Sequence, residues 1–235
     1  MRIFPLAFAA IAVLSAPAGA AVRNFGITSF EKVRVEGPFK VRLSTGVAPF
    51  AMATGSPAAI DKVAIEMRGN TLVVHASTSS WGGYPGGDAG PVVIDLGTHD
   101  LTSAWLNGSG SMAIDKIRGL SFDLSVQGSG AAAIGVADVD QLNISVGGTA
   151  SASLSGHAAK LTAVVRGVSS LDAVNLAIKD ATIGAEGTAT VAANVSNSVK
   201  VDGNGPITVR FTGGPACTLR VGGSASVSGC KSTSE

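Results

Sequence analysis

The stretch that decides the fold is residues 121–148, which read SFDLSVQGSGAAAIGVADVDQLNISVGG. Apolar side chains alternate with polar ones in two runs, at Phe122, Leu124 and Val126 and again at Leu142, Ile144 and Val146. Glycines end both runs, at Gly128-Ser129-Gly130 and at Gly147-Gly148. An apolar residue at every second position is typical of a strand with one buried face. The stretch therefore predicts two copies of one β unit, each closed by a glycine turn.

The same unit recurs on both sides of this stretch, from about residue 101 to about residue 230. The turn glycines are expected at Gly108, Gly128, Gly147, Gly167 and Gly187, with spacings of 20, 19, 20 and 20 residues. Further turns at Gly203 and Gly222 indicate two more units, the first of them shortened. Strands this short cannot bury an apolar face alone, so each unit is expected to stack on the next.

Stacked β units of this length predict an all-β fold, a right-handed parallel β-helix or solenoid with repeats of about 20 residues. The right hand is expected because parallel crossover connections are strongly biased towards it. We expect one elongated repeat domain over residues 21–235, with an N-terminal part over 21–100 and regular repeats over 101–230. The alternative is an antiparallel β-sandwich, because the short strands within residues 30–96 could equally form hairpins.

Residues 1–20 read as a signal peptide. Arg2 supplies a basic start, residues 4–14 are apolar apart from Pro5, and Ala18-Gly19-Ala20 offers small residues for cleavage after Ala20. The apolar run is too short to span a bilayer, so we expect an exported protein with no transmembrane segment after signal cleavage. Its location would be periplasmic, extracellular or on the cell surface.

Charge excludes one class of partner. The chain has 17 basic and 16 acidic residues, and removal of Arg2 with the leader leaves 16 of each. Charged residues make up only 14% of the chain, well under the usual quarter. Nucleic acids and acidic membranes attract proteins through an excess of basic residues. We therefore expect no nucleic-acid partner.

The two cysteines, Cys217 and Cys230, both lie near the C-terminus. A disulfide is the default state of such a pair in an exported protein, and two free buried thiols are the alternative. The bond would lie in the last unit, where the open end of a stack needs to be closed. Two cysteines alone cannot make a structural zinc site of the usual kind, and we expect no metal and no cofactor.

Four short motifs resemble one known family. They are Phe30-Glu31-Lys32-Val33-Arg34-Val35-Glu36-Gly37, Asn70-Thr71-Leu72-Val73-Val74, Leu106-Asn107-Gly108-Ser109-Gly110 and Val126-Gln127-Gly128-Ser129-Gly130. In this order they resemble the putative auto-transporter adhesin family with a head GIN domain, over residues 30–230. The resemblance implies a β-helix-like fold in the bacterial envelope and brings no established catalytic residue. After residue 147 the Gly-Ser-Gly turn is replaced by Gly-Gly-Thr, Gly-Val-Ser and Gly-Thr-Ala, which leaves the later turn geometry open.

The sequence contains none of the common catalytic motifs, such as G-x-S-x-G, a Walker loop or H-E-x-x-H. A carbohydrate-active β-helix enzyme is the alternative interpretation, and its candidate groups would be the corner charges Asp115, Lys116, Arg118, Asp138 and Asp140. His99 and Asp100 could polarise a water or hold a metal, but a solvated turn is the simpler expectation. We therefore expect no enzymatic activity.

The candidate ligand-binding residues are aromatic. Trp81 and Tyr84 lie in the segment 81–88, WGGYPGGD, whose glycines and proline predict a loop. Trp105 ends a strand just before the turn at Gly108. Exposed aromatic side chains offer a large contact area to sugars or partner surfaces, although those of the loop could instead plug the stack. We expect a non-catalytic, adhesin-like binding or scaffolding protein, whose partner is a glycan or an envelope protein.

Overall fold

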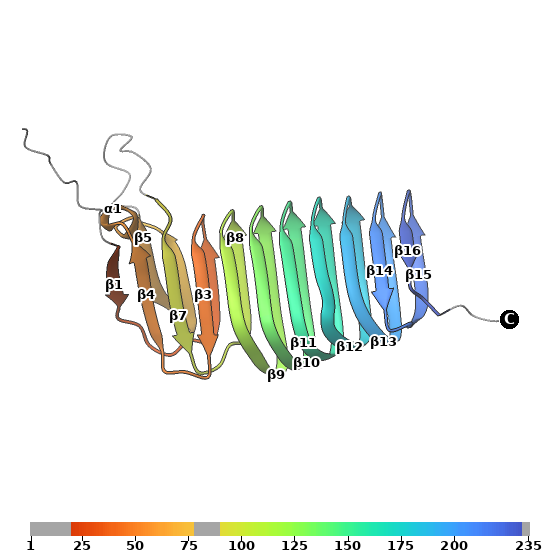
Figure 1. Cartoon of the computed structure of the whole chain (residues 1–235), viewed down its shortest axis with the longest axis horizontal. Coiled ribbons are helices and arrows are strands. Elements are labelled where there is room, and N and C mark those ends of the chain that lie inside the picture. The colour runs from red at the N-terminus through yellow and green to blue at the C-terminus, as the bar shows by residue number, and fades with distance from the viewer. Residues whose placement is uncertain (1–19, 78–89, 232–235) are drawn as a thin grey trace, which may run out of the picture.

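The computed structural model describes residues 20–77 and 90–231, and nearly all of this part is β-structure (Figure 1). The predicted leader, apart from Ala20, lies outside the described residues. The first strand, β1, begins at Ala21. None of the helices in the described ranges is long and apolar enough to cross a membrane.

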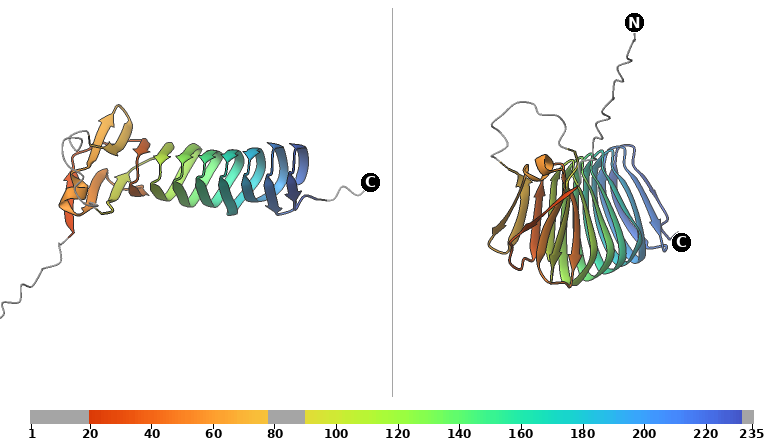
Figure 2. Two further views of the ribbon diagram at one scale, coloured as in Figure 1. Left: turned by 90° about the horizontal axis from the view of Figure 1, so that it is seen from above. Right: turned by 60° about the vertical axis from the view of Figure 1, so that its left-hand side comes forward.

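The regular part of the chain is a parallel β-solenoid, as predicted (Figure 2). Five long, bent strands each form most of one coil: β9 (Ser111–Gly128), β10 (Ala131–Gly148), β11 (Ser151–Gly167), β12 (Ser170–Gly187) and β13 (Thr190–Asn204). Adjacent coils pair in parallel, and Ala131 of β10 lies between Ser111 of β9 and Ser151 of β11. The first half of every coil therefore builds one face of the solenoid and the second half builds another.

Three shorter strands complete the C-terminal end: β14 (Thr208–Thr212), β15 (Ala216–Gly222) and β16 (Ser226–Ser228). β14 and β16 continue the face made by the first halves of the coils, and β15 continues the second face by pairing with β13. No further coil covers β15 within the described residues. Its inward positions Leu219 and Val221 are therefore 43% and 39% exposed.

The solenoid also extends into the N-terminal part. β2 (Lys32–Glu36) and β3 (Lys40–Thr45) form one layer, and they pair in parallel with β8 (Ser103–Gly108) and with the start of β9. β6 (Thr71–Ala76) and β7 (Val93–Thr98) form the next layer outward, in parallel with β2 and β3. Segments far apart in the sequence therefore lie side by side.

Over residues 20–77 and 90–231, antiparallel pairing is confined to the N-terminal end. β4 (Phe50–Gly55) pairs with β7, β1 (Ala21–Phe25) pairs with β4, and β5 (Val63–Arg68) pairs with β6. The short helix α1 (Pro57–Ile60) joins β4 to β5. The β-sandwich alternative is wrong for the repeats, because β9 to β13 pair only in parallel with one another. In the part of the chain that the structure describes, antiparallel pairing occurs where the stack ends and an open edge has to be covered.

From the layer of β2 and β3 onward, a ladder of glycines occupies the turn of each layer. Seven turn glycines have positive φ and stack in order: Gly37, Gly108, Gly128, Gly148, Gly167, Gly187 and Gly205, followed by Gly223 in the last turn. From Gly108 onward their spacings are 20, 20, 19, 20, 18 and 18 residues, which confirms the predicted period and the shortened unit after Gly187, while the last unit is also 18 residues long. Three predicted positions were wrong by one or two residues, since Gly148, Gly205 and Gly223 take the role expected of Gly147, Gly203 and Gly222.

Close stacking explains why these positions are glycine. A Cβ on Gly128 would lie 2.7 Å from the carbonyl oxygen of Gly108, and that oxygen accepts a hydrogen bond from the Ser129 N–H at 3.0 Å. Thr149 N–H donates to Gly128 O in the same way, at 2.8 Å. The loss of the second glycine after residue 147 leaves this geometry intact, because the replacing residues Ala150, Ser169 and Ala189 are buried in the stack.

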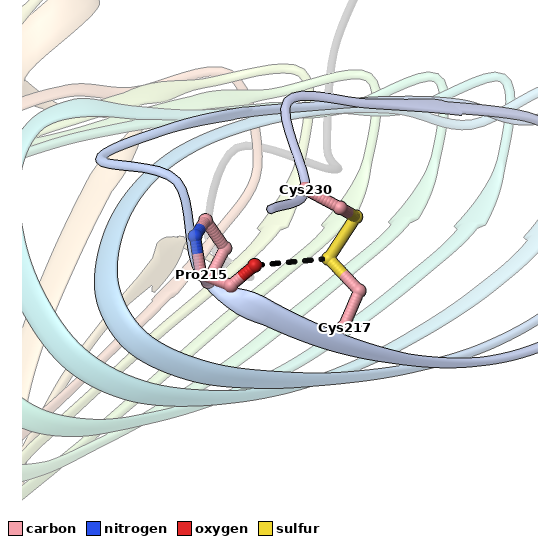
Figure 3. Close-up of a disulfide and its surroundings, with 3 residues drawn as sticks. All are labelled: Pro215, Cys217 and Cys230. Atoms are coloured by element: carbon pink, nitrogen blue, oxygen red, sulfur yellow. Dashed lines mark hydrogen bonds between the residues drawn. A yellow bond between two sulfur atoms is a disulfide. The ribbon is translucent and has the colours of Figure 1, made fainter. Parts of the chain in front are cut away.

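The predicted disulfide between Cys217 and Cys230 is present, with Cα atoms 5.7 Å apart (Figure 3). It joins β15 to the segment that follows β16. The Pro215 carbonyl oxygen lies 3.7 Å from the Cys217 Sγ and accepts a hydrogen bond from Lys231 N–H at 2.9 Å. The bond therefore ties the end of the chain to the last coil, which has no further layer to hold it among the described residues.

Candidate functional site

The groove that contains Trp105 is the candidate binding site. It lies on the outer surface of the face built by the second halves of the coils and has a volume of about 400 Å³. Its lining residues come from four strands, β2, β6, β8 and β9: Arg34, Thr71, Trp105, Leu106, Asn107, Ser125 and Gln127. Trp105 is half-buried, so part of its indole ring is available to a ligand.

Strand register brings these side chains together. Arg34, Trp105 and Ser125 are direct neighbours across β2, β8 and β9, and Asn107 lies beside Gln127 in a second row. Successive side chains of a strand point to opposite faces. Leu106 therefore points into the core and is 1% exposed, while Trp105 and Asn107 face outward.

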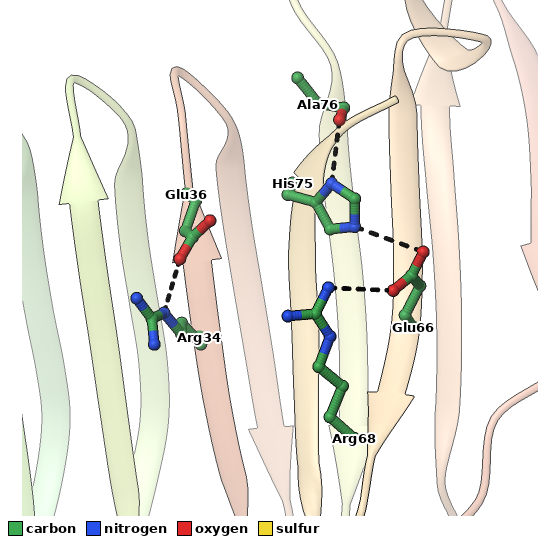
Figure 4. Close-up of polar contacts among 6 residues, drawn as sticks. All are labelled: Arg34, Glu36, Glu66, Arg68, His75 and Ala76. Atoms are coloured by element: carbon green, nitrogen blue, oxygen red, sulfur yellow. Dashed lines mark hydrogen bonds and ion pairs between the residues drawn. The ribbon is translucent and has the colours of Figure 1, made fainter. Parts of the chain in front are cut away.

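One groove residue, Arg34, forms an ion pair, and further ion pairs lie on the strands beyond it. The Arg34 Nε lies 2.6 Å from Glu36 Oε1 on the same strand (Figure 4). On the neighbouring strands, Glu66 contacts both the Arg68 Nη2 at 3.3 Å and the His75 Nε2 at 3.5 Å. Such half-exposed pairs add little to stability. The pair with Glu36 does favour one position of the Arg34 side chain beside Trp105.

The groove combines one aromatic surface with several neutral hydrogen-bonding groups. Asn107 and Gln127 each carry an amide that both donates and accepts, and Ser125 and Thr71 carry hydroxyls that do the same. An indole ring covers an apolar surface and orients it, and the polar groups then select the ligand. This set of groups suits a ligand with an apolar face and many hydroxyls.

The described residues include only some of the predicted site residues. Trp105 lies in the groove, and its role as a ligand-binding residue stays a prediction. Trp81 and Tyr84 lie outside the described residues, in the segment that connects β6 to β7. The disulfide cysteines lie at the other end of the solenoid, away from β8.

Sequence reasoning missed Arg34, Asn107, Ser125 and Gln127, although a signal for them exists. Counted back from the turn glycine, Arg34, Trp105 and Ser125 all stand three residues before Gly37, Gly108 and Gly128. Asn107 and Gln127 both stand one residue before their glycines. In a solenoid, residues that stand at the same distance from the turn glycine in adjacent coils lie side by side. The signal was hidden because 71 residues separate Gly37 from Gly108, so that the first layer did not look like a repeat.

The corner charges do not line this groove. Lys116 and Arg118 line a second, smaller pocket together with His99 and Asp100, whereas Asp138 and Asp140 line neither pocket. His99 and Asp100 are exposed, as expected of a solvated turn. Over residues 20–77 and 90–231, no group of three or more His, Cys, Asp or Glu side chains could hold a metal ion.

The architecture is thus that of an elongated parallel β-solenoid with an antiparallel end and an aromatic groove on one outer face. Residues 29–215 match the family described as putative auto-transporter adhesin, head GIN domain. The chain belongs to this family, as its motifs indicated. No curated protein matches the chain.

Several solved structures have the same fold. A putative adhesin from Bacteroides fragilis is 16% identical, with a TM-score of 0.78 over 90% of this chain and 97% of its own. A putative adhesin from Parabacteroides merdae is 15% identical, with a TM-score of 0.68 over 88% of this chain and 95% of its own. A protein from Parabacteroides distasonis, named a putative lipid binding protein, is 17% identical, with a TM-score of 0.65 over the same shares. At these identities the similarity shows the fold alone.

Proposed function

We propose that this protein is an exported envelope or surface protein that binds a glycan in the Trp105 groove without chemically changing it. The observation that carries the proposal is the arrangement of Trp105 between Arg34 and Ser125, with the amides of Asn107 and Gln127 beside it. A sugar ring has an apolar face that can lie on an indole and hydroxyls that amides and a guanidinium can bind. The adhesin description of the family supports a binding role at the cell surface.

The alternative of a carbohydrate-active enzyme has less support. Most glycosidases place two carboxyl groups on either side of the bond to be broken. Among the described residues, those that line the Trp105 groove include no aspartate or glutamate. The carboxylate of Glu36, on β2, is paired with Arg34. A binding role therefore fits the groove better than hydrolysis does.

A glycan array probed with the purified, exported chain tests the proposal. The informative variant is Trp105→Ala, and the matched control is Thr182→Ala, which changes an outward residue of the same face on β12. We expect the variant to lose binding to the glycans that the wild type retains, and the control to bind normally. Thermal unfolding of both variants shows whether the fold is preserved.

Fluorescence provides a second readout. The chain has two tryptophans, so Trp81→Phe leaves Trp105 as the single indole reporter. A glycan that lies on the ring should shift or quench its emission in a saturable way. Full retention of glycan binding by Trp105→Ala would contradict the proposal. Saturable binding to phospholipid vesicles or to an envelope protein, with no glycan bound, would contradict it as well.

A further inference from the structure

We propose that a second pocket, between the end of β3, the middle of β9 and the connection from β7 to β8, binds a small oxyanion such as a phosphate or carboxylate group. Its lining residues are Thr45, Gly46, His99, Asp100, Leu101, Lys116, Ile117 and Arg118, and its volume is about 190 Å³. The proposal does not rest on the Trp105 groove, which has different lining residues.

The pocket exists because the first complete coil has an uncovered corner. In β9, residues 116–119 pair with residues 136–139 of β10 on one side. On the other side β3 follows β9 only from Lys40 to Leu43 and then departs at Gly46, whose N–H donates to His99 O at 2.9 Å. Residues 116–119 of β9 therefore have no paired strand on the N-terminal side among the described residues, and the pocket lies on that side.

Two cations face this pocket from one edge of β9. Ile117 is 1% exposed and points into the core, so Lys116 and Arg118 on either side of it project outward together. The Lys116 Cε and Nζ lie 3.6 Å from the place where a side chain on Gly46 would begin. Gly46 has φ +72°, and a Cβ at this position would be in ordinary van der Waals contact with the end of the Lys116 side chain.

The nearby carboxylates form no ion pair with these cations within the described residues. Asp115 Oδ1 accepts hydrogen bonds from the backbone N–H groups of Thr45 at 3.0 Å and Lys116 at 2.5 Å. Asp138 lies beside Arg118 in the strand register, yet the two side chains form no ion pair. Within the described parts of the chain, no carboxylate oxygen lies within 4.0 Å of the Lys116 ammonium or the Arg118 guanidinium. Arg34, Arg42 and Arg166, in contrast, each pair with a carboxylate.

The donor set matches an oxyanion. Arg118 can offer two parallel N–H donors to a phosphate or carboxylate, and Lys116 adds a compact positive charge. His99, exposed at the rim, can donate through a ring N–H. Among the described lining residues Asp100 is the one acidic residue, so these residues together carry a formal charge of +1 at neutral pH, with Asp115 and Asp138 outside the lining. Since roughly 15 Å³ is enough to hold one water, the pocket has room for a small anion and its hydrating waters.

Titration of the purified, exported chain with inorganic phosphate, and separately with glucuronate, tests the proposal by NMR or calorimetry. The key variant is Lys116→Gln with Arg118→Gln. The matched control is Lys200→Gln with Arg210→Gln, which removes the same two charges from exposed positions on β13 and β14. We expect saturable binding of at least one anion, weakened by roughly ten-fold or more in the key variant and unchanged in the control.

Several results would separate this pocket from other causes. Saturable binding of phosphate alone or of glucuronate alone supports the proposal and identifies the chemical source of the oxyanion. Equal weakening in the control variant would mean general charge attraction and would overturn the proposal. No saturable binding of either anion would overturn it too. Trp105→Ala should leave phosphate binding unchanged, so failure of the glycan proposal and failure of this one are distinguishable.

Discussion

Replacing Gly148 by alanine should destabilise the solenoid strongly, and the size of the effect can be worked out from the turn. Gly148 has φ +90°, and an alanine held in this backbone region costs about 1–3 kcal/mol. Its Cβ would also lie under 3.0 Å from the carbonyl oxygen of Gly128, closer than Cβ atoms approach such an oxygen. That oxygen belongs to the backbone of the coil beneath and accepts the Thr149 N–H, so it cannot move aside alone. Displacing a packed layer costs about another 1–3 kcal/mol.

Two control glycines separate backbone strain from contact. Gly119 has φ +133°, and no atom lies within 4 Å of the place where its Cβ would stand, so Gly119→Ala should cost only the strain of about 1–3 kcal/mol. Gly184 has ordinary φ, and its Cβ would be 3.9 Å from the nearest atoms. Gly184→Ala should therefore be neutral, or more stable by about 0.4–1 kcal/mol, because alanine reduces the freedom of the unfolded chain.

Guanidinium chloride unfolding, followed by circular dichroism, compares the three variants with the wild type. The unfolding midpoint should be highest for Gly184→Ala, lower for Gly119→Ala and lowest for Gly148→Ala. Gly148→Ala should be about 2–6 kcal/mol less stable than the wild type. The denaturant slope has to be checked as well, because stacked repeats can lose two-state behaviour. Equal midpoints for Gly148→Ala and Gly184→Ala would refute the idea that close stacking of the glycines fixes the turns.

Three further predictions concern the rest of the molecule. Replacing Cys217 and Cys230 together by alanine opens a loop with a sequence separation of 13 residues and should cost about 3 kcal/mol in denaturant unfolding, whereas an unchanged midpoint would show that the last coil is held without the bond. Hydrogen bonds from Ser198 at 2.5 Å and Asn197 at 2.7 Å lower the pKa of Asp180 below its ordinary value of 3.8. The ionised Asp180 carboxylate therefore stabilises the folded state fully above pH 3.8, and this stabilisation is lost as the pH falls through the lowered folded-state pKa. When the pH is lowered from about 6 to about 2, the melting temperature of Asp180→Asn should therefore fall less than that of the wild type. Deleting residues 131–150 removes one whole coil and puts Ser151 in the place of Ala131, so circular dichroism should still show a folded, shorter solenoid. Deleting residues 131–140 removes half a coil, which puts the following strands out of register, and this variant should not fold. A folded half-coil deletion together with an unfolded whole-coil deletion would contradict the register.

The candidate sites were only partly visible in the sequence. Trp105 was recognisable as an aromatic residue beside a turn. Its partner Arg34 lies 71 residues earlier in the chain, the same distance that separates their turn glycines Gly37 and Gly108. His99 and Lys116 stand out in the sequence only as separate polar residues, and no pattern indicates that they share a pocket. Side chains that meet through strand pairing carry no local pattern of their own when the paired strands are distant along the chain.

The sequence by itself determined the repeat. Alternating apolar residues and glycines spaced by about twenty residues define a coil and its neighbour, because each short strand can be buried only by the next unit. The tertiary structure alone decided that β2 and β3 form a layer of the same stack, that hairpin pairing closes its N-terminal end, and that Trp105 lies beside Arg34. The physical reason is that periodicity reflects interactions between consecutive coils, whereas the pairing of remote segments depends on which exposed edges remain once the coils have stacked.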